Sequence, residues 1–167
     1  MAFGLAVLRR ALVASLIGTV VAICAPGGAR AEDEDVLSRD SVLRDRDIPA
    51  FGNPDGDITI VEWFDYQCPY CKKVAPDLAQ VVKEDGKVRL VMKDWPILGA
   101  PSKLAARLVL ATRYQDKYQA SHDALIGMTG RLTETTLREA LSKAGVDLAK
   151  ADADLVAHQG EIDALLA

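Results

Sequence analysis

The sequence predicts an α/β fold in which two cysteines lie where a strand turns into a helix. Residues 58–64 (ITIVEWF) are β-branched, aromatic and almost entirely apolar, as expected of a strand buried on both faces. A helix is predicted from Pro69 to Glu84, with Gly86 ending it, because proline suits a first helical position where its missing N–H would have no partner. Residues 87–95 largely alternate apolar and polar side chains, as a second strand does. A right-handed crossover then makes the two strands parallel neighbours.

The chain after Pro101 is predicted to be helical. Leu104, Leu108 and Ala111 form one apolar stripe at helical spacing, and a second helix is expected over residues 118–127. The order of elements is therefore strand, helix, strand and then a run of helices.

The helices near the end of the chain are marked by their caps. Thr133 is a good N-cap for a helix over residues 134–144, because Leu132 and Leu137 are placed to form a hydrophobic staple around it. Gly145 lies where that helix needs a left-handed residue to end it. Two more helices are predicted, from Asp147 to about residue 157 and from Ala164 onward.

The first thirty-one residues read as a cleavable signal peptide. Arg9 and Arg10 precede an uncharged apolar run over residues 11–24, and residues 29–31 (ARA) supply the small-x-small pattern of a signal peptidase site, with cleavage expected after Ala31. The apolar run is shorter than the roughly 20 residues of a membrane-spanning helix. A retained membrane anchor, twin-arginine export and a lipoprotein site at the cysteine within this run are the less favoured alternatives.

The charge of the chain argues against binding to polyanions, and its cysteines are expected to form a pair. The formal net charge is −4, the basic residues form no block, and the sequence therefore gives no indication of binding to nucleic acid or to an anionic membrane. Removing residues 1–31 would leave Cys68 and Cys71 as the cysteines of the mature chain. An exported chain meets an oxidising compartment, where such a pair is expected to form a disulfide.

The segment between the signal peptide and the first strand is predicted to be an N-terminal arm over residues 32–50. Its apolar residues Val36, Leu37, Val42 and Leu43 allow a short amphipathic helix, but a solvated arm is favoured. The following residues 48–57 are rich in proline and glycine and read as a turn-rich lead-in. The predicted parts of the chain are therefore 1–31 (signal peptide), 32–50 (arm), 51–99 (strand–helix–strand) and 100–167 (helical domain).

Cys68 and Cys71 have the spacing of a redox pair. Residues three apart on a helix have Cα atoms about 5 to 6 Å apart, which a disulfide accepts without movement of the fold. Cys68 falls at the helix start, where backbone N–H groups and the helix dipole favour a thiolate and make it the attacking sulfur. Cys71, one turn further on and more shielded, would resolve the mixed disulfide. Pro69 and Tyr70 between them are the predicted substrate-contacting residues.

Glu62 is the third candidate for a catalytic residue. It interrupts an apolar strand, and a buried carboxyl group resists ionisation, so its pKa is expected to be raised. It could then exchange a proton with Cys71 during turnover. The alternative is a glutamate at the end of a strand that faces solvent or pairs with Lys93.

A zinc site is the main alternative for the cysteine pair. Zinc takes four ligands, usually with a second cysteine pair or two histidines. His122 and His158 lie far along the helical part without ligand spacing and are expected to be surface or helix-packing residues. Neither a metal nor another cofactor is therefore expected.

Three stretches of the sequence resemble the DsbA-like family of bacterial periplasmic disulfide oxidoreductases. They are residues 51–54 (FGNP), 60–71 (IVEWFDYQCPYC) and 93–99 (KDWPILG). The resemblance implies a thioredoxin-like fold into which the helical run after Pro101 is inserted as a domain. It also implies that Cys68 is the nucleophile, Cys71 the resolving thiol and Glu62 the buried acid. The CPYC string occurs in glutaredoxins too, but the export signal and the long helical part argue against these short cytosolic proteins.

The sequence departs from this family at its end. In the family a strand–strand–helix half follows the helical insertion and brings a cis-proline beside the cysteines. Here the last proline is Pro101, so this C-terminal half is expected to be missing and the sheet to have about two strands.

Three functions remain open on the sequence. The first is a periplasmic oxidase that donates its disulfide to exported proteins with cysteines. The second is an isomerase or reductase of the same superfamily, kept reduced by a membrane redox partner, and an oligomerising helix over residues 36–43 would favour it. The third is a truncated, non-catalytic exported protein.

Overall fold

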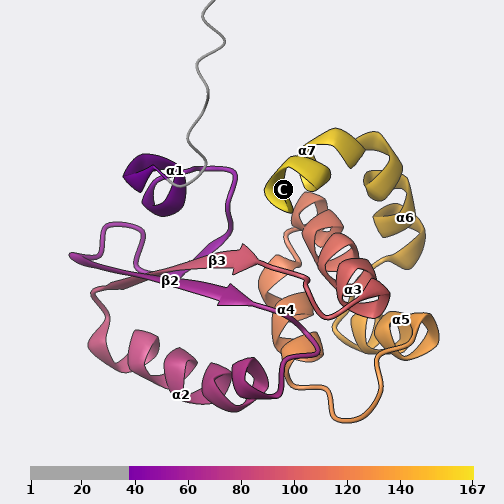
Figure 1. Ribbon diagram of the computed structural model, residues 1–167, viewed down its shortest axis with the longest axis horizontal. Helices are drawn as coiled ribbons and strands as arrows, with labels where there is room; N and C mark the ends of the chain where they lie inside the picture. The colour runs from indigo at the N-terminus through magenta and orange to yellow at the C-terminus, as the bar shows by residue number, and fades with distance from the viewer. Residues whose placement is uncertain (1–37) are drawn as a thin grey trace, which may run out of the picture. The chain divides into compact units, whose positions relative to one another are not determined.

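The computed structural model describes residues 38–167, so the predicted signal peptide and the first part of the arm lie outside the described residues. Within residues 38–167 a three-stranded sheet is accompanied by seven α-helices (Figure 1). The elements are α1 (Arg39–Leu43), β1 (Ala50–Gly52), β2 (Ile58–Phe64), α2 (Pro69–Asp85), β3 (Val88–Asp94), α3 (Ala100–Ala111), a 3-10 helix (Thr112–Gln115), α4 (Tyr118–Ile126), α5 (Glu134–Lys143), α6 (Leu148–Ala157) and α7 (Gln159–Leu165).

The sheet has the strand order β1–β3–β2. β2 and β3 are parallel neighbours, which confirms the predicted crossover through α2. β1 pairs antiparallel with β3, Phe51 opposite Leu90, so the sheet has three strands and the prediction of about two is wrong. β1 is only three residues long and lies inside the segment that its prolines and glycines marked as turn-rich. Tertiary pairing with β3 overrides that local signal.

Burial in the sheet is the reverse of the prediction. β3 lies in the middle, and its residues Val88, Leu90, Val91 and Met92 are all buried. β2 lies at an edge of the sheet formed by residues 38–167, and its Ile58 is 51% exposed. The apolar character of β2 therefore does not mean burial on both faces, because the central position belongs to β3.

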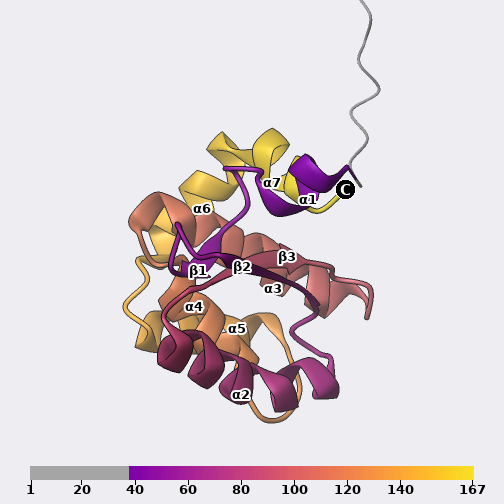
Figure 2. The same cartoon turned by 90° about the vertical axis from the view of Figure 1, so that its left-hand side faces the viewer.

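Helices cover both faces of the sheet (Figures 1 and 2). α2 lies on the face that carries Leu90 and Met92, while α1 lies on the opposite face. Arg89 donates a hydrogen bond to the carbonyl of Leu43 at 2.5 Å, and Lys93 donates one to the carbonyl of Ser41 at 3.3 Å. Cations are favourable beside the C-terminal carbonyls of a helix. The favoured interpretation of this segment as a solvated arm is thus wrong for residues 39–43.

The helical part is built around α3. Leu108 and Val109 on this helix are fully buried, and α3 contacts α4, α5, α6 and α7. The predicted ends are confirmed, since Thr133 caps α5 with a capping box and Gly145 has a φ of 82° just beyond it. Asp147 caps α6 through its side chain, also as predicted.

The last helix differs from the prediction. α7 begins at Gln159, and the expected start at Ala164 lies close to its end. The apolar cluster at residues 164–166 suggested a beginning, whereas the residue that anchors α7 in the core is Ile162, which is 0% exposed.

Candidate active site

Cys68 is the N-cap of α2, at the end of the turn that follows β2. Its sulfur accepts a hydrogen bond from the backbone N–H of Cys71 at 3.4 Å, and Pro69 occupies the first position of the helix as predicted. Both cysteines are free thiols and half-buried. The strand–turn–helix context therefore places the two sulfurs one helical turn apart, with the first at the positive end of the helix dipole.

The two sulfurs differ in acidity. The backbone N–H of Cys71 is the largest cause of a lowered pKa at Cys68, and the Cys71 side chain and the backbone of Tyr70 add to it. At Cys71 the pKa is raised, first by burial and further by its contact with Cys68 and the charge of Glu62. The site thus contains one sulfur that ionises readily beside one that holds its proton.

Glu62 faces the interior side of β2. It lies opposite Met92 in the register, whereas Lys93 lies opposite Trp63 and so belongs to the other face of the sheet. The alternative pairing of Glu62 with Lys93 is therefore wrong. Burial raises the pKa of Glu62, as expected, and its charge acts on Cys71.

A cavity of about 610 Å³ lies between α2, α4 and the sheet, and Glu62 forms part of its wall. His122 and Asp123 of α4 line it from the opposite side, and Lys72 lines it from α2. The Nζ of Lys72 donates a hydrogen bond to the carbonyl of Met128 at 2.5 Å, and burial lowers the pKa of this lysine.

Asp65 organises the turn before Cys68 and was missed by the sequence interpretation. Its carboxylate is buried and accepts hydrogen bonds from the backbone N–H of Gln67, the hydroxyl of Ser102 and the backbone N–H of Leu98. The available signal was a lone acidic residue directly after an apolar strand and before the cysteine motif. Its partners at residues 98 and 102 could not be inferred, because they are distant in sequence.

Exposed apolar side chains surround this turn. Trp63 and Trp95 pack edge to face with ring centroids 6.1 Å apart, and both are about half exposed, at 43% and 53%. Ile97 and Leu98 continue this surface along the loop after β3, and Tyr70 between the cysteines is 78% exposed. Pro69 is exposed as well, so the two predicted substrate-contacting residues are accessible.

A buried aromatic cluster packs around Phe64 and Tyr66, close to the start of the turn that leads to Cys68. His122 packs against Phe64 and Tyr66, and its Nδ1 lies 3.2 Å from the hydroxyl of Tyr66. Burial lowers the pKa of His122 to about 4. His122 is therefore a helix-packing histidine, as predicted. His158 stacks on the ring of Tyr114 at 3.6 Å between ring centroids.

Asp94 is an unusual member of this buried region. The hydroxyl of Tyr118 donates to its Oδ2 at 3.2 Å, while its Oδ1 has no partner among the described residues. Burial raises the pKa of Asp94 to about 8, with the charge of Asp65 adding to the effect. The folded protein thus holds this carboxyl group in its neutral form at neutral pH.

Replacing Asp94 by asparagine should remove a pH dependence of stability. The folded carboxyl group keeps its proton up to about pH 8, whereas in the unfolded chain it loses the proton near its ordinary pKa of 3.8. The unmodified protein therefore loses stability as the pH rises through this window, at most about 1.4 kcal/mol for each pH unit. The asparagine variant lacks this loss, so its relative stability should increase with pH.

Urea unfolding of both proteins across this pH range measures the difference. His122 titrates in both proteins, so its contribution cancels. Free energies of unfolding that stay parallel across the range would contradict the prediction.

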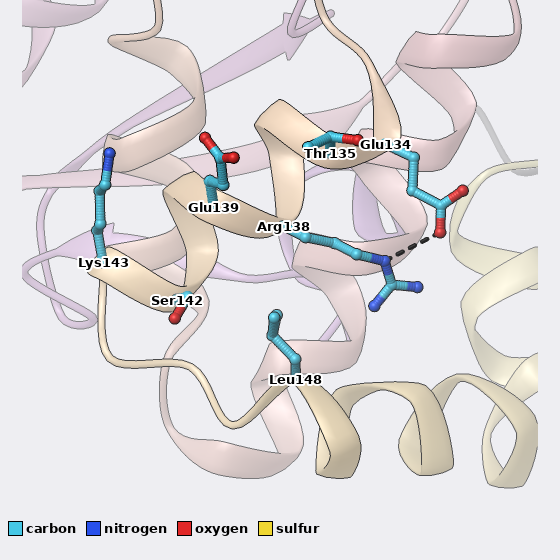
Figure 3. A pocket seen from close by; sticks show the side chains of 7 residues that line it. All are labelled: Glu134, Thr135, Arg138, Glu139, Ser142, Lys143 and Leu148. Atoms are coloured by element: carbon cyan, nitrogen blue, oxygen red, sulfur yellow. Dashed lines mark hydrogen bonds and ion pairs between the residues drawn. The ribbon is translucent and has the colours of Figure 1, made fainter.

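A second hollow is lined mainly by side chains of α5 (Figure 3). Its side chains include Glu134, Arg138 and Glu139, and Arg138 pairs with Glu134 at 2.9 Å and with Asp152 at 3.0 Å. Those ion pairs engage Arg138 and Glu134, and the lining of this hollow contains neither a thiol nor a histidine. The candidate active site is therefore the turn at the end of β2 that carries Cys68.

Residues 38–167 contain no group of three or more histidine, cysteine or carboxylate side chains that could hold a metal ion. In the same residues there is no helix with the length and apolarity needed to cross a membrane.

Comparison with known proteins gives a consistent set of matches. A family model described as a DSBA-like thioredoxin domain matches residues 59–163. A thioredoxin-like oxidoreductase from Silicibacter pomeroyi DSS-3 is 43% identical, with a TM-score of 0.69 and 77% of each chain covered. The thiol-disulfide exchange protein alpha-DsbA2 from Wolbachia pipientis is 26% identical, with a TM-score of 0.70, covering 74% of this chain and 67% of that one. A periplasmic thioredoxin-like protein from Salmonella enterica serovar Typhimurium is 27% identical, with a TM-score of 0.62, covering 72% and 75%.

Curated relatives match over shorter shares of their own length. The Na⁺/H⁺ antiporter NhaA 1 of Salinispora arenicola is 25% identical over 126 residues, which are 74% of this chain and 18% of the antiporter. The probable disulfide bond formation protein D of Bacillus cereus is 33% identical over 72 residues, 41% of this chain and 33% of that protein. The chain thus spans less than half the length of these relatives.

Proposed function

Because the chain belongs to the DSBA-like thioredoxin domain family, we propose that it is a thiol–disulfide oxidoreductase that exchanges disulfides with cysteine-containing exported proteins through Cys68 and Cys71. One observation carries the proposal: the sulfur of Cys68 caps α2 and accepts the N–H of Cys71, which lowers the pKa of Cys68, while burial raises the pKa of Cys71. Such a pair has one sulfur suited to attack and to leave, and one suited to hold a proton until the ring closes.

The exchange begins with the disulfide form of the pair. A thiolate of the client attacks the sulfur of Cys68, the bond between Cys68 and Cys71 breaks, and its electron pair goes to the sulfur of Cys71. Glu62, whose pKa is raised by burial, supplies the proton that Cys71 takes up. The client is now joined to Cys68 in a mixed disulfide.

A second thiolate of the client completes the reaction. It attacks the client sulfur of the mixed disulfide, and Cys68 leaves as a thiolate stabilised by the backbone N–H of Cys71. The client gains a disulfide and loses two electrons, and the pair ends as a dithiol. A membrane redox partner would take up these electrons and restore the disulfide.

The difference in pKa between Cys68 and Cys71 favours the oxidase direction over the isomerase or reductase direction. Lowering the pKa of Cys68 stabilises the dithiol form relative to the disulfide, which makes the disulfide a stronger oxidant. A periplasmic location agrees with the predicted signal peptide over residues 1–31 and with the periplasmic neighbour from Salmonella.

The proposal predicts that Cys68 titrates below a free cysteine. In a Cys71→Ser variant Cys68 is the single thiol of the mature chain, and it keeps the N–H of residue 71, the largest cause of the shift. The rate of alkylation by iodoacetamide, followed against pH, should therefore rise at a lower pH than that of a free cysteine.

The matched control is Cys68→Ser, which leaves Cys71 as the single thiol. Its burial should move alkylation to a higher pH than that of a free cysteine. A Cys68 that titrates like an ordinary thiol would refute the proposed function.

A further inference from the structure

Asp65 joins three segments around the redox pair. The first residue after β2, it is 4% exposed, and its Oδ1 accepts hydrogen bonds from the N–H of Gln67 and the hydroxyl of Ser102, both at 2.7 Å. Its Oδ2 accepts the N–H of Leu98 at 2.9 Å. One carboxylate therefore holds the turn before Cys68, the loop after β3 and the first turn of α3.

Gln67 reinforces this network with its side chain. Its Nε2 donates to the carbonyl of Leu98 and to the hydroxyl of Ser102, both at 2.9 Å. The N–H of Cys68 in turn donates to the carbonyl of Asp65 at 3.0 Å. The turn that carries the attacking sulfur is thus hydrogen-bonded on one side to Asp65 and on the other to the loop. A buried network with its members satisfied is rigid.

The apolar surface beside Cys68 depends on the same network. Ile97 and Leu98 belong to the loop that Asp65 holds, and the N–H of Trp95 at its start donates to the carbonyl of Phe64 at 2.8 Å. Loss of the Asp65 contacts would remove the hydrogen bond of the Leu98 N–H and leave the one from Gln67 to the Leu98 carbonyl, while the start of the loop stays attached to β2. The position of the sulfur and that of the neighbouring apolar side chains are therefore set together.

Asp65 also acts on both sulfurs. The pKa of Cys68 is lowered mainly by the backbone N–H of Cys71, and the charge of Asp65 opposes this as the smallest of the causes. A hydrogen bond from the backbone of Asp65 lowers the pKa of Cys71, against the larger effect of burial. The charge of Glu62 on β2 also raises the pKa of Cys71, and the charge of Asp65 adds to the raised pKa of Asp94 on β3. Lys72 of α2 is directed to the carbonyl of Met128.

Resting on the proposed function, we propose that Asp65 is a positioning residue, which fixes the turn of Cys68 to the loop of residues 95–99. Its carboxylate also carries a negative charge three residues before Cys68, so two different observables report on it. The hydrogen bonds hold the loop, and the charge moderates the reactivity of the sulfur. A residue that only supports the fold would change the first observable without lowering the pKa of Cys68.

The test is Asp65→Asn, with Asp77→Asn as the matched control. Asp77 is an exposed aspartate of α2, and its replacement removes the same charge without touching the network. In Asp65→Asn the pKa of Cys68 should fall, and alkylation at acidic pH should be about two- to threefold faster. In this variant the backbone N–H of Leu98 would face an NH₂ group in place of Oδ2, or would have no acceptor. Its hydrogen should therefore exchange with solvent at least about tenfold faster, as measured by NMR. Asp77→Asn should change neither.

The outcomes separate this inference from the proposed function. If Cys68 of the unmodified pair titrates like a free cysteine, the proposed function fails. The role of Asp65 is refuted if the pKa of Cys68 is low in the unmodified protein and Asp65→Asn does not lower it further. It is also refuted if Asp65→Asn leaves hydrogen exchange at the Leu98 amide unchanged. Should Asp65→Asn not fold, Ser102→Ala tests the positioning part, because it removes one donor and keeps the charge. Faster exchange at Leu98 with no fall in the pKa of Cys68 is expected there, and unchanged exchange would overturn the inference.

Discussion

Replacing Cys68 by serine should reduce disulfide exchange by at least about a hundredfold, because the sulfur proposed to attack and to leave is lost and a hydroxyl cannot replace it at neutral pH. The sulfur of Cys68 is the one that accepts the N–H of Cys71 and has the lowered pKa. The reduction of insulin by dithiothreitol and the refolding of scrambled ribonuclease, both with residues 32–167, measure the loss.

The Cys71→Ser variant gives a matched control for this experiment. It keeps the proposed attacking sulfur but lacks the thiol proposed to resolve the mixed disulfide, so mixed disulfides with the client should accumulate on non-reducing gels. Activity that survives in Cys68→Ser would contradict the assignment of the nucleophile. An inactive unmodified protein would favour the alternative of a non-catalytic exported chain.

Replacing Leu108 by alanine should lower the free energy of unfolding by about 3 kcal/mol. Leu108 is 0% exposed on α3, the helix that contacts α4, α5, α6 and α7. Truncating it leaves a cavity that four surrounding helices cannot all move to fill. Urea unfolding followed by circular dichroism at 222 nm measures the change.

Val156→Ala is the control for the core substitution. Val156 is 78% exposed on α6, so its truncation should change the free energy of unfolding by less than about 0.5 kcal/mol. Equal losses in the two variants would mean that α3 is not the centre of the helical core.

Local signals in the sequence predicted the elements well. β2, α2 and β3 were placed to within about two residues, because proline at a helix start, glycine at a helix end and β-branched runs act through neighbouring residues. Thr133 and Gly145 mark the ends of α5 for the same reason. The position of Cys68 at the helix start followed directly from these signals.

Features that depend on distant residues were not predictable in this way. β1 exists because it pairs with β3, and β2 lies at the sheet edge because β3 takes the centre. Whether a strand is buried depends on which strands and helices pack beside it. The residues of the strand do not specify these neighbours. Asp65 is the clearest example at the site, since its partners Leu98 and Ser102 are 33 and 37 residues away in the chain.

The sulfur that caps α2 couples the redox state of the cysteine pair to the conformational stability of the protein. As a thiolate Cys68 is a charged acceptor for the N–H at the helix start, and charged acceptors make stronger hydrogen bonds than neutral ones. In the disulfide that charge is gone and the first turn of the helix is held less firmly. Reduction of the Cys68–Cys71 disulfide by two electrons is therefore expected to stabilise the fold, much as a ligand that binds the folded state does.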